Sequence, residues 1–167
     1  MSRFTDSLQP GGFHHRLHQL VGEWEGVTRT WLEPDVLTDE SPTRGTFRPI
    51  LGGRFLTYEY EGKVGDDPMV GIAIIGYDLT SQRYQTAWID SWHMGTGILF
   101  SQGARGEQGG LVPNVSGSYP VNDGSPDWGW RTEYDLQAPD RLVITAYNIT
   151  PDGQEARATE TVYTRIK

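Results

Sequence analysis

The sequence predicts an all-β fold, an antiparallel up-and-down barrel of roughly ten strands with a short N-terminal helix plugging one end. Strand-like runs alternate with segments rich in glycine, proline, asparagine and aspartate, which favour turns. Nearly all these connections are short, as a meander requires, whereas a Greek-key sandwich needs a few long crossings. Glycine also recurs within the strand-like runs, where bent barrel strands tolerate a missing side chain.

One helix is expected before the strands, at residues 12–21, because its apolar residues repeat on one face and Gly22 follows them. Strands are expected at residues 22–32, 43–51, 54–64, 69–78, 83–92, 95–104, 111–121, 128–137, 141–150 and 154–166. The acidic segment at residues 33–42 is the main irregular connection, and we expect it to act as a flap over one end of the barrel.

Size and composition narrow the classes of protein. The 167 residues, 36% of them hydrophobic, suit a single domain that spans residues 1–167. The absence of cysteine excludes disulfides and thiolate metal sites. With a net charge of -8 and scattered basic residues, nucleic acid is not an expected partner. The chain shows neither a secretory signal nor a membrane-spanning apolar run, so we expect a cytoplasmic protein without membrane contact, and a homodimer stays open.

Five short motifs follow one another along the chain in a characteristic order: GEWEG at residues 22–26, LGGRFL at 51–56, GYD at 76–78, WIDS at 88–91 and YTR at 163–165. On these motifs the chain resembles DUF1579, an uncharacterised bacterial family with a lipocalin-like barrel. The resemblance spans nearly the whole chain and implies a fold, not a reaction. The Gly-x-Trp opening is also similar to lipocalins and haem-binding nitrobindins, which adds apolar ligands and haem by analogy. In that pattern Trp24 closes the barrel floor against the helix.

Strand alternation predicts three polar side chains on otherwise apolar inward faces, namely Asp90, Asn148 and Glu160. An acid against apolar walls loses hydration, which raises its pKa and suits it to proton transfer near neutral pH. The alternative is structural, because buried polar groups usually bond to neighbours or enclosed water and fix the strand register.

Aromatic residues form a second candidate set. Six of them fall on predicted inward faces: Tyr58, Tyr60, Trp88, Phe100, Trp130 and Tyr134. They are candidates for the wall of a pocket for a planar ligand, with polar tips that orient it. Ordinary core filling explains the same pattern equally well, because small barrels pack their interiors with large side chains.

Histidine is the remaining chemical resource. His93 has the opposite parity to Asp90, yet a bulge at residues 91–92 would bring it inside beside the acid, as a general base or an axial haem ligand. His14 and His18 share a helix face, but the sequence lacks the glutamate of the zinc-protease motif, so we expect no metal site.

Two functions of different classes follow. We prefer a binding protein that encloses a small, mostly apolar or aromatic molecule, oriented by Asp90, Asn148 and Glu160. The alternative is a cofactor-free isomerase, cyclase or decarboxylase, in which one buried acid or His93 transfers a proton. Haem binding is a second alternative, and no other cofactor is expected. A filled barrel with a role in assembly is the remaining hypothesis, and a cavity of at least a few hundred cubic ångströms would count against it.

Overall fold

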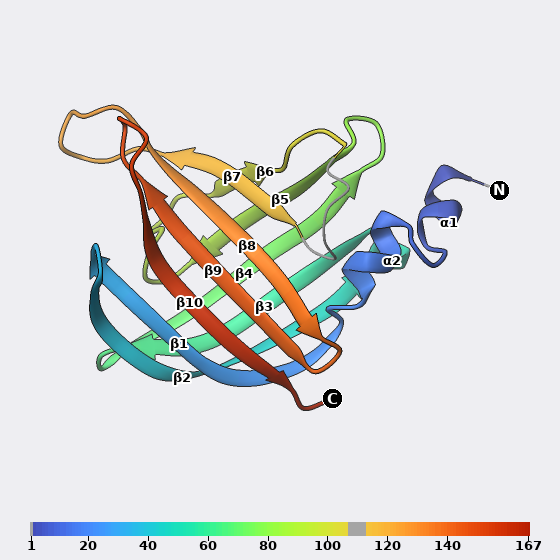
Figure 1. Cartoon of the computed structure of the whole chain (residues 1–167), viewed down its shortest axis with the longest axis horizontal. Helices are drawn as coiled ribbons and strands as arrows, with labels where there is room; N and C mark the ends of the chain where they lie inside the picture. The colour runs from blue at the N-terminus through green and yellow to red at the C-terminus, as the bar shows by residue number, and fades with distance from the viewer. Residues whose placement is uncertain (1, 107–112) are drawn as a thin grey trace.

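The computed structural model describes residues 2–106 and 113–167, which form ten antiparallel strands closed into one barrel (Figure 1). The strands are β1 (Gly22–Glu33), β2 (Val36–Ile50), β3 (Phe55–Val64), β4 (Asp67–Asp78), β5 (Arg83–Asp90), β6 (Leu99–Gln102), β7 (Asn114–Tyr119), β8 (Trp128–Ala138), β9 (Arg141–Ile149) and β10 (Glu155–Arg165). Each strand pairs with its neighbours along the chain, and β1 pairs with β10 to complete the ring. The predicted up-and-down barrel is therefore confirmed.

The glycines of the opening motif lie where β1 meets the C-terminal segment. Gly26 pairs with Tyr163 across this junction, and a Cβ at Gly26 would lie 1.8 Å from the carbonyl oxygen of Val162. Gly22 has a φ of 144°, and a Cβ there would lie 2.4 Å from the carbonyl oxygen of Lys167. The motif is thus explained by the close approach of two backbones that closes the barrel.

We expect Gly26→Ala to lower the free energy of unfolding by about 1–3 kcal/mol, because β1 and β10 must separate to admit the methyl group. Urea unfolding measures the change. Gly62→Ala is the matched control, since the nearest atom to its added Cβ, the Thr43 hydroxyl oxygen, is 3.3 Å away. Equal losses in the two variants would contradict the closure argument.

Two short helices, α1 (Arg3–Ser7) and α2 (Phe13–His18), precede the barrel, and α2 packs against the end of β4 (Figure 1). The expected single helix at residues 12–21 is shorter than predicted, because the chain turns after α2 through hydrogen bonds of three-residue spacing. Helix α1 was not predicted, because it is five residues long and too short to show a helical period. In the described part of the chain, no helix has the length and apolar character to span a membrane.

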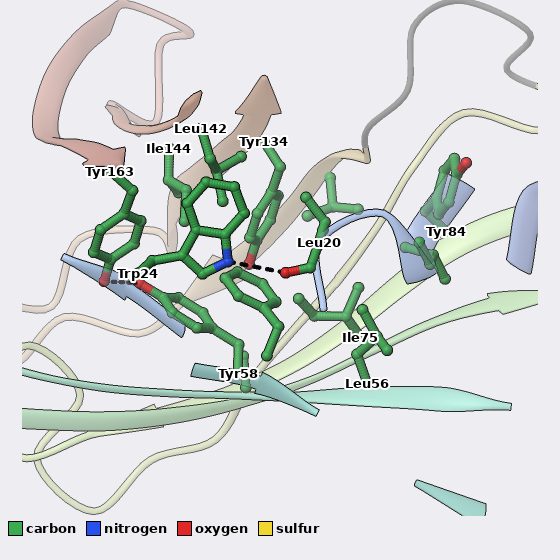
Figure 2. Packing of buried hydrophobic residues seen from close by; sticks show 14 of the residues in the cluster. Leu20, Trp24, Leu56, Tyr58, Ile75, Tyr84, Tyr134, Leu142, Ile144 and Tyr163 are labelled. Atoms are coloured by element: carbon green, nitrogen blue, oxygen red, sulfur yellow. Dashed lines mark hydrogen bonds between the residues drawn. The ribbon is translucent and has the colours of Figure 1, made fainter. Parts of the chain in front are cut away.

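Trp24 closes the barrel floor against the helical segment, as predicted. Its side chain is 1% exposed, and its indole Nε1 donates to the carbonyl oxygen of Leu20 at 3.0 Å (Figure 2). Leu17 and Leu20 are equally buried in the same cluster. The guanidinium carbon of Arg165 lies 4.2 Å from the centre of the indole ring. The floor is therefore sealed by apolar packing with one satisfied polar atom.

The histidines of the N-terminal segment anchor it. His14 is buried, and its Nδ1 lies 2.8 Å from the hydroxyl of Ser7, which joins α2 to α1. Burial lowers the pKa of the His14 imidazole, and the nearby His18 lowers it further. The Nε2 of His18 lies 2.9 Å from the carbonyl oxygen of Gly53, at the other side of the floor. Both side chains have a structural explanation, and no group of three or more metal-ligating side chains occurs in residues 2–106 and 113–167.

The acidic segment at residues 33–42 is not a flap, and this prediction is wrong. It forms the tip of a hairpin and the first half of β2, and Asp35 takes a φ of 60° in the turn. Glu33, Asp35 and Glu40 are exposed, and Glu40 accepts a hydrogen bond from Arg29 at 2.5 Å. Asp39 is half-buried on the same strand face as Ser41 and accepts from its hydroxyl at 2.7 Å. Pro42 lies within β2 without breaking a ladder, because β3 pairs with β2 only from Arg44 onward. Charge on an exposed strand face was misread as a loop.

Candidate functional site

A cavity of about 80 Å³ lies inside the barrel. Its walls are largely aromatic, from Tyr58, Tyr60, Trp88, Trp130 and Tyr134, with hydroxyl groups from Thr28, Thr43, Thr86, Ser101, Thr132, Thr159 and Thr161. His93 also lines it. None of the described lining residues carries a carboxylate, ammonium or guanidinium group. The cavity wall thus combines apolar aromatic rings with neutral hydroxyl groups and one imidazole.

The size of the cavity limits its contents. It exceeds the roughly 10–15 Å³ that one water molecule requires, and it is smaller than the roughly 150 Å³ of an engineered cavity that binds benzene. Pockets for drug-sized molecules have volumes of about 300–1,000 Å³. The observed volume therefore suits several waters, or one small ring after modest side-chain movement.

Asp90 ends β5 and organises the turn that follows. Its Oδ1 accepts backbone N–H groups from Trp92 at 3.3 Å, His93 at 2.6 Å and Met94 at 2.8 Å. Its Oδ2 lies 2.5 Å from Nδ1 of His93 and 3.4 Å from the hydroxyl of Tyr60. A carboxylate that accepts from three successive amides folds the chain back on itself. This turn brings His93 to the cavity.

The position of His93 beside Asp90 agrees with the sequence prediction, but the cause differs. No bulge occurs at residues 91–92, because β5 ends at Asp90 and the turn begins there. The carboxylate can only accept, so Nδ1 of His93 carries the proton of their hydrogen bond. Nε2 is then the ring nitrogen with a lone pair, and among residues 2–106 and 113–167 it has no hydrogen-bond partner.

The electrostatics of Asp90 differ from the expectation. Its side chain is completely buried, and burial alone would raise the pKa of the carboxyl. The hydrogen bond and charge of His93, with the backbone N–H groups of Met94 and His93, outweigh burial and hold the pKa below its ordinary value. The predicted raised pKa is wrong for Asp90. Asp90 is an anchored carboxylate and not a proton donor.

Three aromatic rings surround the imidazole of His93. The ring centres of Trp92, Trp88 and Trp130 lie 4.7, 5.7 and 5.9 Å from that of His93. Trp88 and Trp130 stack on each other at 5.3 Å with 24° between their planes. The imidazole thus lies beside a pair of indoles that also line the cavity, tilted by 47° from Trp88 and 58° from Trp130, and it is 15% exposed.

Tyrosine hydroxyls form two hydrogen-bonded groups in the interior. Nε1 of Trp88 donates to the hydroxyl of Tyr60 at 2.8 Å, and Tyr60 donates in turn to Asp90. The hydroxyls of Tyr58 and Tyr163 lie 2.7 Å apart (Figure 2). Burial raises the pKa of Tyr58, Tyr60 and Tyr163, that of Tyr163 to about 12. These side chains remain phenols, which donate hydrogen bonds without releasing protons near neutral pH.

Five of the six aromatic residues predicted to face inward do line the cavity: Tyr58, Tyr60, Trp88, Trp130 and Tyr134. Phe100 does not, and this prediction is wrong. Its side chain is 52% exposed, while Leu99 and Ser101 on either side are buried. Leu99 and Phe100 are both apolar, so alternation alone does not decide which of them points inward.

Glu160 also lies on the outside, which corrects the prediction that it faces inward. The register of β10 against β9 shifts between Arg157 and Thr159. The shift moves Thr159 and Thr161 into the cavity wall and turns Glu160 outward. There its carboxylate lies 3.4 Å from Arg29 and 3.5 Å from Arg157. A bulge of one residue therefore removes the second acid from the candidate site.

Asn148 has the inward parity that was predicted, next to Trp130 on the neighbouring strand β8. Its Oδ1 accepts from the hydroxyl of Tyr119 at 2.6 Å. The amide thus has a bonded partner on β7 and belongs to the frame of the interior, outside the cavity lining that the described residues form.

The threonine and serine hydroxyls of the cavity wall were not predicted from the sequence. Thr28 and Thr161 bond to each other at 2.7 Å, and the hydroxyl of Thr43 donates to the carbonyl oxygen of Glu61 at 3.0 Å. A signal was present, since Thr28 shares the inward face of β1 with Trp24. Threonine on an inward strand face was treated as neutral, although barrels that hold polar atoms need such groups.

Taken together, the ring of strands, the sealed floor and the enclosed cavity define a lipocalin-like β-barrel. The chain belongs to the DUF1579 family, described as a protein of unknown function, whose family model matches residues 9–165. The resemblance stated from the motifs is therefore confirmed.

Among solved structures, the chain is similar to the S-type phycobiliprotein lyase CPES from Guillardia theta, with a TM-score of 0.55 and 9% sequence identity. The match covers 100% of this chain and 99% of that one. At this identity the likeness shows the fold alone. No curated protein matches the sequence.

Proposed function

We propose that the barrel binds a small, mostly apolar or aromatic molecule in its interior cavity. The observation that carries the proposal is the composition of the wall, in which indole and phenol rings enclose a space that also holds seven hydroxyl side chains and the imidazole of His93. Apolar walls with a few placed polar groups are typical of ligand sites.

The volume limits the ligand to about one ring, which requires modest side-chain movement to enter. A cavity of about 80 Å³ lies well below the few hundred Å³ that larger organic ligands occupy. For the same reason haem, which is much larger than the cavity, is not proposed. The fold shared with a phycobiliprotein lyase adds nothing on ligand identity.

Cavity-filling variants test the proposal. Trp88 and Trp130 line the cavity, so ligand entry from a set of single-ring aromatic compounds should change the tryptophan fluorescence. Ala146→Leu and Ala73→Leu place extra carbons in the cavity wall and should weaken binding at least about tenfold, the effect of about 1.4 kcal/mol of steric conflict.

Ala87→Leu is the matched control, because Ala87 alternates with the cavity residues Thr86 and Trp88 and so lies on the outer face of β5. Circular dichroism and thermal unfolding establish that the variants fold. The proposal loses its basis if no compound in the set changes the fluorescence, or if the inner and outer variants bind equally well.

A further inference from the structure

The cavity contains one side chain that is suited to exchange a proton. Imidazole belongs to the class of groups that gain and lose protons between pH 5 and 8. The three tyrosines of the wall do not compete, because burial raises the pKa of Tyr58, Tyr60 and Tyr134. The remaining polar lining groups are hydroxyls of serine and threonine. His93 is therefore the base of the described cavity wall.

The surroundings of His93 suit it to accept a proton at Nε2. Asp90 takes the proton on Nδ1 into a 2.5 Å hydrogen bond, which leaves the lone pair on Nε2. When Nε2 is protonated, the carboxylate compensates the positive charge of the ring. Three backbone N–H groups hold that carboxylate in place, so it does not need to move. A carboxylate and an imidazole in this arrangement act together as a general base.

We propose that His93 takes the proton of an acidic hydroxyl on the bound ligand, a phenol or an enol, and holds the product as an oxyanion beside the imidazolium. The O–H bond of the ligand breaks and an N–H bond forms at Nε2, with no other reactant. Asp90 is a positioning residue in this step, and Tyr60 supports it through its bond to Oδ2. The inference rests on the proposed function, because it needs a ligand in the cavity.

The side chains of the cavity wall explain why the acidic hydroxyl of the ligand is expected on an aromatic or conjugated molecule. Trp88 and Trp130 offer flat faces next to His93, which suit a planar ring. Delocalisation into such a ring is also what makes a hydroxyl acidic enough for imidazole to deprotonate. Asp90 on β5 is the charged group in contact with His93; Tyr60 on β3 donates to the same carboxylate, and Tyr134 on β8 lines the same cavity.

Binding of 4-nitrophenol tests the inference, because its phenolate absorbs visible light and its phenol does not. At a pH about one unit below the pKa of the probe, saturating wild-type protein should raise the phenolate fraction at least about fivefold above that of the unbound probe, as a shift of more than one pKa unit would produce. His93→Gln should abolish the increase, and Asp90→Asn should reduce it. Glu160→Gln, which changes a carboxylate on the outside, should leave it unchanged.

Tryptophan fluorescence, followed in the same titration, separates the two proposals. Quenching without the phenolate band, or a band that persists in His93→Gln, overturns proton transfer and leaves ligand binding intact. A probe that does not bind at all contradicts both for this ligand class. Nitrogen NMR of the histidine rings in the wild-type protein covers the case in which His93→Gln does not fold. At a pH where the ring of ligand-free His93 is neutral, the probe should convert it to the imidazolium form, and an unchanged ring would refute the inference.

Discussion

Replacing Trp24 by alanine is expected to lower the free energy of unfolding by about 3–5 kcal/mol, the typical loss for a buried large aromatic side chain. The side chain is 1% exposed, so its truncation removes nearly all its packing contacts and leaves a cavity in the floor. The carbonyl oxygen of Leu20 also loses the indole N–H that bonds to it. Urea unfolding followed by circular dichroism measures the change.

Two further variants separate the contributions of the Trp24 hydrogen bond and of its burial to the free energy of unfolding. Trp24→Phe keeps most of the ring and removes the hydrogen bond, so we expect a smaller loss of about 1–3 kcal/mol. Trp31→Ala is the matched control on the same strand, where the indole is partly exposed under Arg157, and its loss should be below about 1.5 kcal/mol. If Trp24→Ala costs no more than Trp31→Ala, the floor is not held by Trp24.

Strand alternation predicted the interior correctly on several regular strands, but it chose the wrong face for Phe100 on β6, where the neighbouring Leu99 is also apolar. On β5 it placed Trp88 and Asp90 inside, and on β9 it gave Asn148 the inward parity. The same rule failed at Glu160, because alternation assumes a continuous register and the bulge between Arg157 and Thr159 breaks it. A bulge depends on pairing between strands, which the local pattern of one strand does not contain.

The candidate site was only partly predictable for a related reason. The partnership of Asp90 and His93 depends on a turn held by backbone amides, so it follows from three-dimensional hydrogen bonding and not from residue spacing. The pKa of Asp90 shows the same limit. Burial was foreseeable from the apolar neighbours, whereas the N–H groups that outweigh it appear only once the chain has turned.

Replacing Asp90 by alanine is expected to lower the free energy of unfolding by about 2–4 kcal/mol, because several hydrogen bonds to one charged group are lost and their donors are left without a partner. Asp90→Asn keeps an oxygen for the backbone amides and should lose less, about 1–2 kcal/mol. Glu160→Gln is the control, because its ion pairs with Arg29 and Arg157 lie on the outer face and should contribute below about 1 kcal/mol.

The contribution of Asp90 to the free energy of unfolding should also decrease at acidic pH. The pKa of its carboxyl is lower in the folded protein than the ordinary value of about 3.9 that it has in the unfolded chain. The ionised carboxylate therefore contributes its full stability above about pH 4, and this contribution is lost as the pH falls through the lower folded-state pKa. The stability difference between the wild type and Asp90→Asn should shrink as the pH falls below about 4. Urea unfolding of both proteins across this range measures it, and a difference that grows on acidification would show that burial, not the hydrogen bonds, controls the carboxyl.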